Sequence, residues 1–287
     1  MTTVVSETGY SASHTLSVRT ELVRQLRRRR TLVAYAIVCA LPVVVVIAVA
    51  LGPDSGRGGR FGGGDLDLVG LATAGAWNFT LTMLLFSSGF LLVVVAALFL
   101  GDTVASEASW STLRYLLTAP VPRRRLLRSK VIVGLALAIG ALLALVVVSF
   151  VVGLIAFGSA GLTSPVGGSF DLTTSVERTA IVTAYIALTM MIPAGVAFLL
   201  SVLTDVPLGA VGGAVLLVII SGILEAIEPL GDLRRFLPGH YGRAWSDALG
   251  AEVVWSDMAL GASYAVVTFA VLLAVAMLVF ERKDIVS

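Results

Sequence analysis

Cysteine, lysine and histidine are scarce in this chain of 287 residues. Cys39 is the only cysteine, so the chain forms no intrachain disulfide and no thiolate metal site. The two lysines, Lys130 and Lys283, do not follow the glycine-rich loop that cradles nucleotide phosphates. The two histidines, His14 and His240, are far apart and lack the neighbours of a metal centre. Disulfide-stapled folds, metal centres and a nucleotide site are therefore excluded.

Charge is also missing from long stretches of the chain. Charged residues make up 13% of the sequence and hydrophobic residues 57%, with a mean hydropathy of +0.98. Residues 31–53, 68–101 and 131–170 hold no charged side chain. A helix needs about 20 apolar residues to cross a bilayer core of about 30 Å. The sequence therefore predicts an all-α membrane protein with six transmembrane helices, near residues 31–51, 77–100, 131–157, 179–203, 208–225 and 257–280.

The basic residues are distributed unevenly between the predicted loops. With the amino terminus inside, fourteen of the 20 basic residues flank spans on the cytoplasmic side, and six lie outside. The positive-inside rule therefore predicts that both termini are cytoplasmic. The run Arg27–Arg30 precedes the first span directly, which favours contact with anionic membrane lipid and not with nucleic acid. The loops hold at most about 30 residues, too few to bury a core of their own, so residues 31–287 form one membrane domain.

Three segments are less apolar than the spans: two precede the membrane domain and one lies between its fifth and sixth spans. Residues 1–12 are small and polar, and we expect them to be disordered. In residues 13–30, Val18, Leu22 and Leu26 recur every four positions among arginines, which predicts an amphipathic helix lying in the membrane interface. The alternative is a charged flank without fixed structure. Residues 225–256 mix aromatic and charged residues, which is typical of short helices at the outer interface; whether they re-enter the membrane stays open.

The segment between the second and third spans has the most specific pattern. Glu107, Ser111 and Arg114 fall on one helical face, with an apolar face beside it formed by leucines. Pro120 and Pro122 end that helix. The pattern predicts a short amphipathic helix near the inner membrane surface, able to seat against another protein. The alternative is a basic loop that serves only membrane topology.

This segment resembles the signature loop of type-2 ABC transporter permeases, the membrane subunits of bacterial ATP-driven exporters. That family has a glutamate, a Gly-Thr pair, a Leu-Leu pair, Pro-x-x-Arg and a lysine that opens the third span. Ser111 stands where the family usually has glycine. The six-span layout, the interfacial helix and the long segment before the last span are similar too. The matching positions here are Glu107, Thr112, Leu116, Leu117, Pro120, Arg123 and Lys130.

The resemblance implies a six-helix permease domain over residues 31–287 in a bacterial plasma membrane. It implies a second permease subunit, identical or different, and two ABC ATPase subunits that bind ATP and Mg²⁺, with no cofactor in this chain. The loop would pack on the ATPase and transmit its closure, driving export by alternating access. The implied coupling interface comprises Glu107, Ser111, Thr112, Arg114, Leu117, Pro120, Arg123 and Lys130.

Two other functions stay open at this point. An ion-coupled carrier or channel would want ionisable residues near the middle of the spans, and none is found there. A non-transporting membrane sensor or anchor would make the loop incidental. No catalytic constellation stands out, so we do not expect an enzyme. Gly209 and Gly213 have the spacing that permits close helix approach, either inside the chain or at a dimer contact. The substrate is not readable from the sequence.

Overall fold

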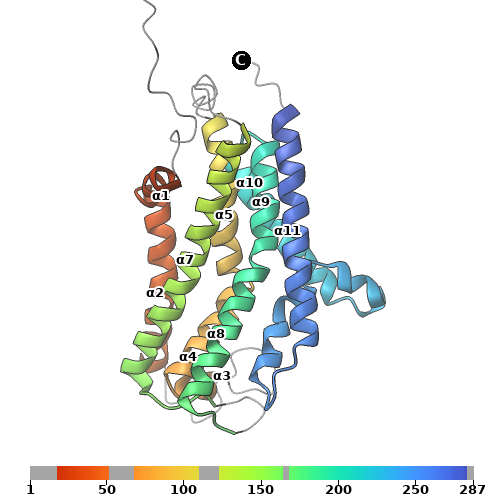
Figure 1. The fold of residues 1–287 in the computed structure, drawn as a ribbon. Coiled ribbons are helices and arrows are strands. Elements are labelled where there is room, and N and C mark those ends of the chain that lie inside the picture. The colour runs from red at the N-terminus through yellow and green to blue at the C-terminus, as the bar shows by residue number, and fades with distance from the viewer. Residues whose placement is uncertain (1–17, 52–67, 110–122, 164–167, 283–287) are drawn as a thin grey trace, which may run out of the picture.

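The protein is almost entirely helical and carries several membrane-length helices. The computed structural model describes residues 18–51, 68–109, 123–163 and 168–282 (Figure 1). Five helices in this part of the chain are long and apolar enough to cross a membrane, and the number rises to six if one sharply bent pair counts as a single span. The chain is therefore a multi-pass membrane protein.

The helices follow one another with short connections. In chain order they are α1 (Val18–Leu26), α2 (Arg29–Leu51), α3 (Leu68–Thr73), α4 (Ala76–Ser88), α5 (Leu91–Ser109), α7 (Arg123–Phe157), α8 (Leu172–Thr189), α9 (Met191–Leu203), α10 (Pro207–Glu225), the 3₁₀ helices η1 (Glu228–Phe236) and η2 (His240–Leu249), and α11 (Ser256–Arg282).

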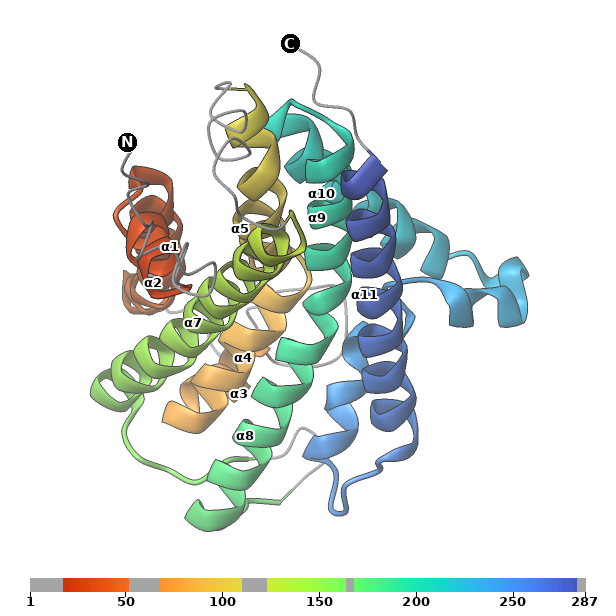
Figure 2. The same ribbon diagram turned by 45° about the horizontal axis from the view of Figure 1, so that its top comes forward.

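The helices run between two ends of the bundle (Figures 1 and 2), and these ends carry different charges. One end carries α1, the carboxyl end of α5, the amino end of α7 and the carboxyl end of α11. We call it the basic end, because its described residues include Arg19, Arg24, Arg27–Arg30, Arg124, Arg125, Arg128, Lys130 and Arg282. We call the opposite end, where α8 and α11 begin, the acidic end; it carries Asp171, Glu177, Glu252 and Asp257.

Two of the predicted spans are not single straight helices. The predicted span 77–100 is broken after Ser88, and α4 and α5 meet at a bend of 56° beside Gly89. The predicted span 179–203 is divided into α8 and α9 at Met190. Pro193 explains this second break, because it has no N–H to donate to the carbonyl of Thr189, four residues earlier.

The third helix is longer than its apolar run. We predicted a span over 131–157, whereas α7 has 35 residues and begins at Arg123. At about 1.5 Å per residue, α7 is about 50 Å long, which exceeds the bilayer core. Its first two turns therefore extend the basic end beyond the apolar run. Lys130 lies in the third turn.

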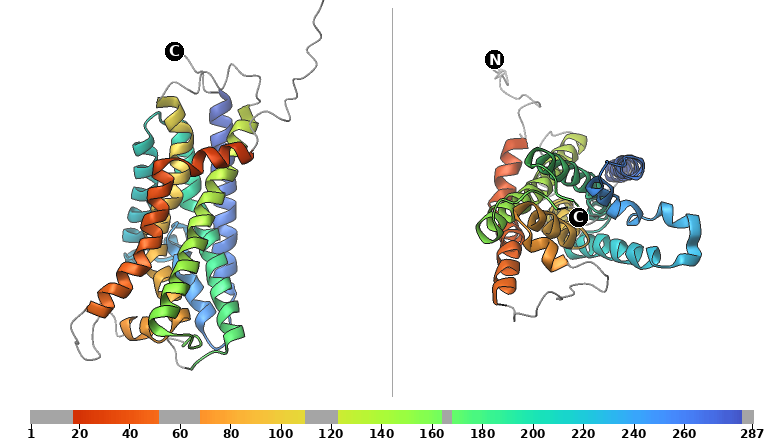
Figure 3. Two further views of the ribbon diagram at one scale, coloured as in Figure 1. Left: turned by 90° about the vertical axis from the view of Figure 1, so that its left-hand side faces the viewer. Right: turned by 90° about the horizontal axis from the view of Figure 1, so that it is seen from below.

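The amino-terminal helix α1 lies across the basic end at a steep angle to α2 (Figure 3). A turn at Arg27 and Arg28 separates the two helices, and the Thr31 hydroxyl donates to the carbonyl of Gln25 at 2.7 Å. Val18 and Leu26, from the predicted apolar stripe, are exposed. The third member of that stripe, Leu22, is partly buried against the core. Residues 1–17 lie outside the described residues.

The centre of the bundle is packed around α5. Its neighbours approach closely at Gly101: a Cβ built there would lie 3.0 Å from Val211 Cγ2 and 3.3 Å from the Val211 backbone nitrogen in α10. It would also lie 3.4 Å from the Cβ of Ala197 in α9. Lipid tails are as apolar as leucine, so such small residues, which let backbones approach, are what hold membrane helices together.

We predict that Gly101→Ala lowers the free energy of unfolding by about 1–3 kcal/mol, because the new methyl group meets the backbone of α10. The matched control is Gly89→Ala, where a Cβ would have no atom within 4 Å and the backbone is already α-helical. Thermal unfolding in detergent compares the two variants with the native chain. Equal melting temperatures for both variants would contradict the close approach.

Candidate functional site

The predicted coupling residues are partly outside the described structure. Ser111, Thr112, Arg114, Leu117 and Pro120 lie outside the described residues, and Arg123 is placed only by its backbone, as the first residue of α7. Glu107 and Lys130 are described in full. They stand at the two ends of that undescribed segment, and the structure brings them together.

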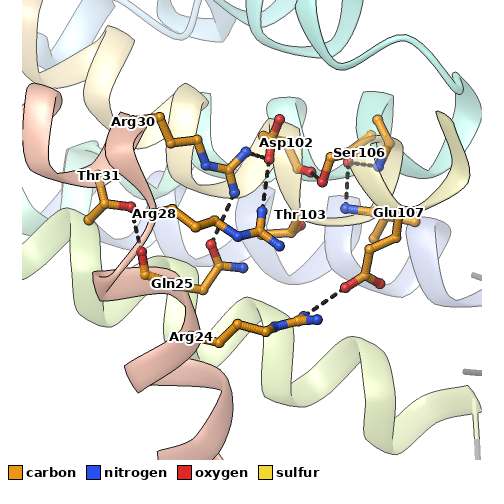
Figure 4. Close-up of polar contacts among 12 residues, drawn as sticks. Arg24, Gln25, Arg28, Arg30, Thr31, Asp102, Thr103, Ser106 and Glu107 are labelled. Carbon is orange, nitrogen blue, oxygen red and sulfur yellow. Dashed lines mark hydrogen bonds and ion pairs between the residues drawn. The ribbon is translucent and has the colours of Figure 1, made fainter. Parts of the chain in front are cut away.

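Glu107 lies in the last turn of α5 and is only 4% exposed. Its Oε1 atom accepts from Nζ of Lys130 at 2.6 Å and from Nη2 of Arg24 at 2.7 Å (Figure 4). A carboxylate taken out of water costs several kcal/mol unless it is paired and hydrogen-bonded. Two charged donors on one oxygen supply that compensation, so Glu107 is an internal ion-pair partner.

Lys130 is the most deeply buried charged residue of the site, with 1% of its surface exposed. Besides Glu107, its ammonium group donates to the backbone carbonyl of Thr103 in α5 at 3.0 Å. It also lies 4.0 Å from Oε1 of Glu21 in α1. A single side chain of α7 thus holds both α5 and α1.

Glu21 completes what we call the buried ion cluster: Glu21, Arg24, Glu107 and Lys130. Arg24 Nη2 lies 2.6 Å from Glu21 Oε2, and Gln25 Nε2 donates to Glu21 Oε1 at 2.9 Å. Burial pushes the pKa of Glu21 upward, but the hydrogen bond from Arg24 and the charge of Lys130 outweigh it. The pKa of Glu21 therefore lies below its ordinary value of 4.5. Two carboxylates face two cations, so the cluster is neutral as a whole.

A second group of charges lies beside the cluster, one and a half turns earlier on α5. Asp102 pairs with Arg28, 3.4 Å from Nη1, and with Arg30 (Figure 4). Arg30 also donates to the Gln25 side chain at 3.0 Å. Burial and the positive charge of Arg24 lower the pKa of Arg28. These contacts tie the turn between α1 and α2 to α5.

The same stretch of α5 is tied to α9 and the neighbouring end of α7 to α11. The hydroxyl of Ser201 in α9 accepts from the backbone N–H groups of Val104, at 3.1 Å, and Ala105, at 2.9 Å. On the surface of the basic end, Arg124 of α7 makes a two-pronged ion pair with Glu281 of α11. The helix ends on both sides of the undescribed segment are therefore fixed to the bundle.

These contacts join the ends of neighbouring helices. Among the described residues, no group of three or more His, Cys, Asp and Glu side chains could hold a metal ion. The carboxylate of Glu107 and the ammonium of Lys130 are committed to one another and closed off from solvent. Such an arrangement fixes three helices relative to one another, so that displacement of the loop base moves α1, α5 and α7 together.

Sequence reasoning placed Glu107 and Lys130 in the site but missed Glu21 and Arg24. It assigned the polar face of α1 to lipid headgroups, whereas Glu21 and Gln25 face the bundle and are buried. The available signal was their spacing of four residues, which puts a carboxylate and an amide on one face. The second signal for a buried ion cluster was Lys130, one of the two lysines of the chain, which stands next to an apolar run.

The predicted pair Gly209 and Gly213 has different surroundings at its two members. A Cβ built at Gly213 would lie 2.8 Å from Leu200 Cδ1 in α9, so Gly213 packs inside the chain. Gly209 is exposed, and a Cβ there would meet only Val206 of the same turn. The two glycines lie one turn apart on the same side of α10, and only Gly213 is covered by α9.

We predict that Lys130→Met destabilises the protein by about 3 kcal/mol, because two buried carboxylates then share Arg24 alone. Replacing the partner as well, in Glu107→Leu with Lys130→Met, recovers part of the loss by removing the orphaned charge. Arg19→Met is the control, since Arg19 is exposed and forms no ion pair within the described structure. Detergent melts of the four proteins test this; a single variant as stable as the control contradicts the cluster.

We also predict an acid-dependent contribution from Glu21. Because its pKa is lowered by folding, its contribution is fully present above its ordinary pKa of 4.5 and is lost as the pH falls through the folded value. The difference in melting temperature between the native chain and Glu21→Gln should therefore be constant near neutral pH and shrink below about pH 4.5. A melting-temperature difference that grows on acidification would contradict a lowered pKa for Glu21.

Comparison with known proteins places the chain in a family. The family described as "Protein of unknown function (DUF2705)" matches residues 66–286. The match covers most of the chain, from just before α3 to just after α11, so the chain belongs to this family. No curated protein matches the sequence at a significant level.

Proposed function

We propose that this member of the DUF2705 family is the membrane-spanning permease subunit of an ATP-driven exporter, working as a dimer with separate ATPase subunits. The basic end is then cytoplasmic, in line with the positive-inside rule, and both termini lie inside a bacterial plasma membrane. One observation carries the proposal: the loop with the permease-like pattern starts and ends at two helices joined by the buried Glu107–Lys130 pair.

The site supports a refined role for Glu107 and Lys130. Both side chains are buried within the chain, so neither offers a charge to a partner surface. We therefore assign ATPase contact to the loop residues Ser111, Thr112, Arg114, Leu117, Pro120 and Arg123, and assign the two buried residues the task of anchoring that loop. A push on a loop anchored in this way is transmitted to α5 and α7 without being absorbed by local bending.

The energy source is assigned to a partner because of the chain's own composition. Neither lysine follows a phosphate-binding loop, so ATP and Mg²⁺ belong to the ATPase subunits. An ion-coupled carrier is the second candidate, since Glu107 and Lys130 are ionisable groups inside membrane-length helices. They lie near the helix ends and neutralise each other, which favours an anchoring role over an ion path. As substrate we propose an amphipathic or lipid-like compound, since the spans carry little charge.

The proposal is tested by purifying the tagged chain from the membranes of its own host and probing the eluate for an ABC ATPase. We predict that the ATPase co-purifies with the native chain, and that the purified chain alone hydrolyses no ATP. Reversing two loop charges, Arg114→Glu with Arg123→Glu, should reduce the co-purified ATPase about tenfold, equivalent to ~1.4 kcal/mol.

The matched control is Glu177→Arg at the acidic end, an exposed charge reversal that should leave co-purification unchanged. ATP hydrolysis by the chain alone, or uptake driven by an ion gradient without ATPase, would overturn the proposal. Equal loss of co-purified ATPase in the loop variant and the control would show that Arg114 and Arg123 do not specifically contact the ATPase.

A further inference from the structure

Three arginines of the basic end have no carboxylate of their own. Arg19 in α1, Arg27 in the turn between α1 and α2, and Arg29 at the start of α2 are exposed and form no ion pair within the described structure. The neighbouring ion pairs do not offset them, because four bases there share three acids. The acids are Glu21, Asp102 and Glu107, and the bases are Arg24, Arg28, Arg30 and Lys130. The described part of this end therefore carries a surplus of positive charge.

Arg29 stands at the head of an exposed apolar face of α2. Leu32, Val33 and Ile37 follow it at spacings of three, four and eight residues, and each is more than half exposed. Only 17% of the apolar window of α2 is buried inside the bundle. In a membrane such a face contacts acyl chains, and a long cationic side chain at its end extends toward the headgroups. Arg29 therefore lies where the phosphate of a lipid packed along α2 would lie.

The helix α1 brings a second arginine to the same place. Arg19, Val23 and Arg27 recur every four residues on its exposed face, and Leu26 is exposed as well. While α2 runs along the bundle, α1 lies across its end (Figure 3). A helix with such a mixed face suits the boundary between headgroups and acyl chains. Arg27 and Arg29 are two residues apart, so their Cα atoms are separated by at most about 7 Å. Both side chains can therefore reach one headgroup.

The turn that carries these two arginines is held from the inside of the bundle. Arg28, which lies between them, is directed to Asp102 of α5, with Nη1 3.4 Å from the carboxylate (Figure 4). The hydroxyl of Thr31 also donates to the carbonyl of Gln25 across the turn at 2.7 Å. The direction of Arg28 leaves Arg27 and Arg29 on the outside. A ligand of the two exposed arginines does not have to order the backbone, so its binding loses little conformational entropy.

We propose that an anionic phospholipid of the leaflet at the basic end binds to the turn between α1 and α2, with its phosphate between Arg27 and Arg29 and an acyl chain along Leu32, Val33 and Ile37. Guanidinium groups bind phosphate through paired N–H bonds, which fixes the headgroup as well as attracting it. The lipid has to carry a net negative charge, because a zwitterionic headgroup would bring a further cation to a site with surplus positive charge. A bound anion offsets this surplus and strengthens the hold of the turn on the bundle.

This lipid site goes beyond the proposed function, and its test needs no ATPase, so the two proposals fail separately. The purified, delipidated chain is melted in a neutral detergent while dioleoyl phosphatidylglycerol or dioleoyl phosphatidylcholine is titrated. We expect phosphatidylglycerol to raise the melting temperature in a saturable manner and phosphatidylcholine to leave it unchanged. The double variant Arg27→Gln with Arg29→Gln should bind phosphatidylglycerol about tenfold more weakly. Its melting temperature without lipid should equal that of the native chain, because neither arginine is in an ion pair within the described structure.

Two single variants separate a site from diffuse attraction by the whole basic end. Arg29→Gln and Arg19→Gln remove the same charge from the same end, but Arg19 lies eight residues before Arg27, about 12 Å along α1. Arg29→Gln should weaken binding several-fold and Arg19→Gln less than about twofold. Arg243→Gln in η2, an exposed arginine far from this end, should have no effect. Equal losses in Arg29→Gln and Arg19→Gln, or equal stabilisation of the native chain by the two lipids, would overturn the site.

A last comparison distinguishes a lipid from a free phosphate compound. Glycerol phosphate carries the phosphate of the lipid without its acyl chains, so it lacks the contact with Leu32, Val33 and Ile37. We expect no rise in melting temperature at the concentrations at which phosphatidylglycerol saturates. Stabilisation by glycerol phosphate at those concentrations would show that phosphate alone is recognised, and the lipid would then be the wrong occupant.

Discussion

The pairing of Glu107 with Lys130 is the contact around which the basic end is organised. Removing either ion from water costs several kcal/mol, and only close, well-directed partners offset that desolvation penalty. The distances of 2.6 Å to Lys130 and 2.7 Å to Arg24 satisfy this condition at Glu107. Because the partners come from α1, α5 and α7, satisfying the charges also fixes where these helices lie. The position of α1 in particular depends on charge, since its buried residues are the polar Glu21 and Gln25.

The rest of the bundle is held by close packing. Membrane helices gain little from burying apolar surface against one another, because lipid offers the same environment. The contacts at Gly101 and the hydroxyl of Ser201, which satisfies two N–H groups of α5, bring α5, α9 and α10 together. By contrast, α2 and α10 remain largely uncovered. For α2 the exposed side chains suit lipid.

The sequence predicts the membrane class of this fold because apolar length has a single physical cause, the thickness of the bilayer. It does not predict the break beside Gly89, since a glycine in an apolar run is compatible with a straight or a bent helix. Glu107 and Lys130 were found through a motif, but the pairing of Glu107 with Arg24 and of Lys130 with Glu21 depends on the turn between α1 and α2 at Arg27 and Arg28, which no local pattern encodes. Likewise, residues 225–256 showed interfacial composition, while the hydrogen bonds that hold them come from Tyr185 and Tyr264 in distant helices.

The cluster and the break in the second span together suggest where the molecule bends. Breaking a buried ion pair costs about 3–5 kcal/mol, so a force on the loop base moves α1, α5 and the start of α7 as one unit. The joint between α4 and α5 offers less resistance, because the chain there is already bent by 56° and a Cβ at Gly89 would touch nothing within 4 Å. Under the proposed function, movement driven from the basic end would turn about Gly89. That joint lies within the apolar part of the bundle. A movement of the loop can alter a path across the membrane only if it changes the arrangement of the helices there.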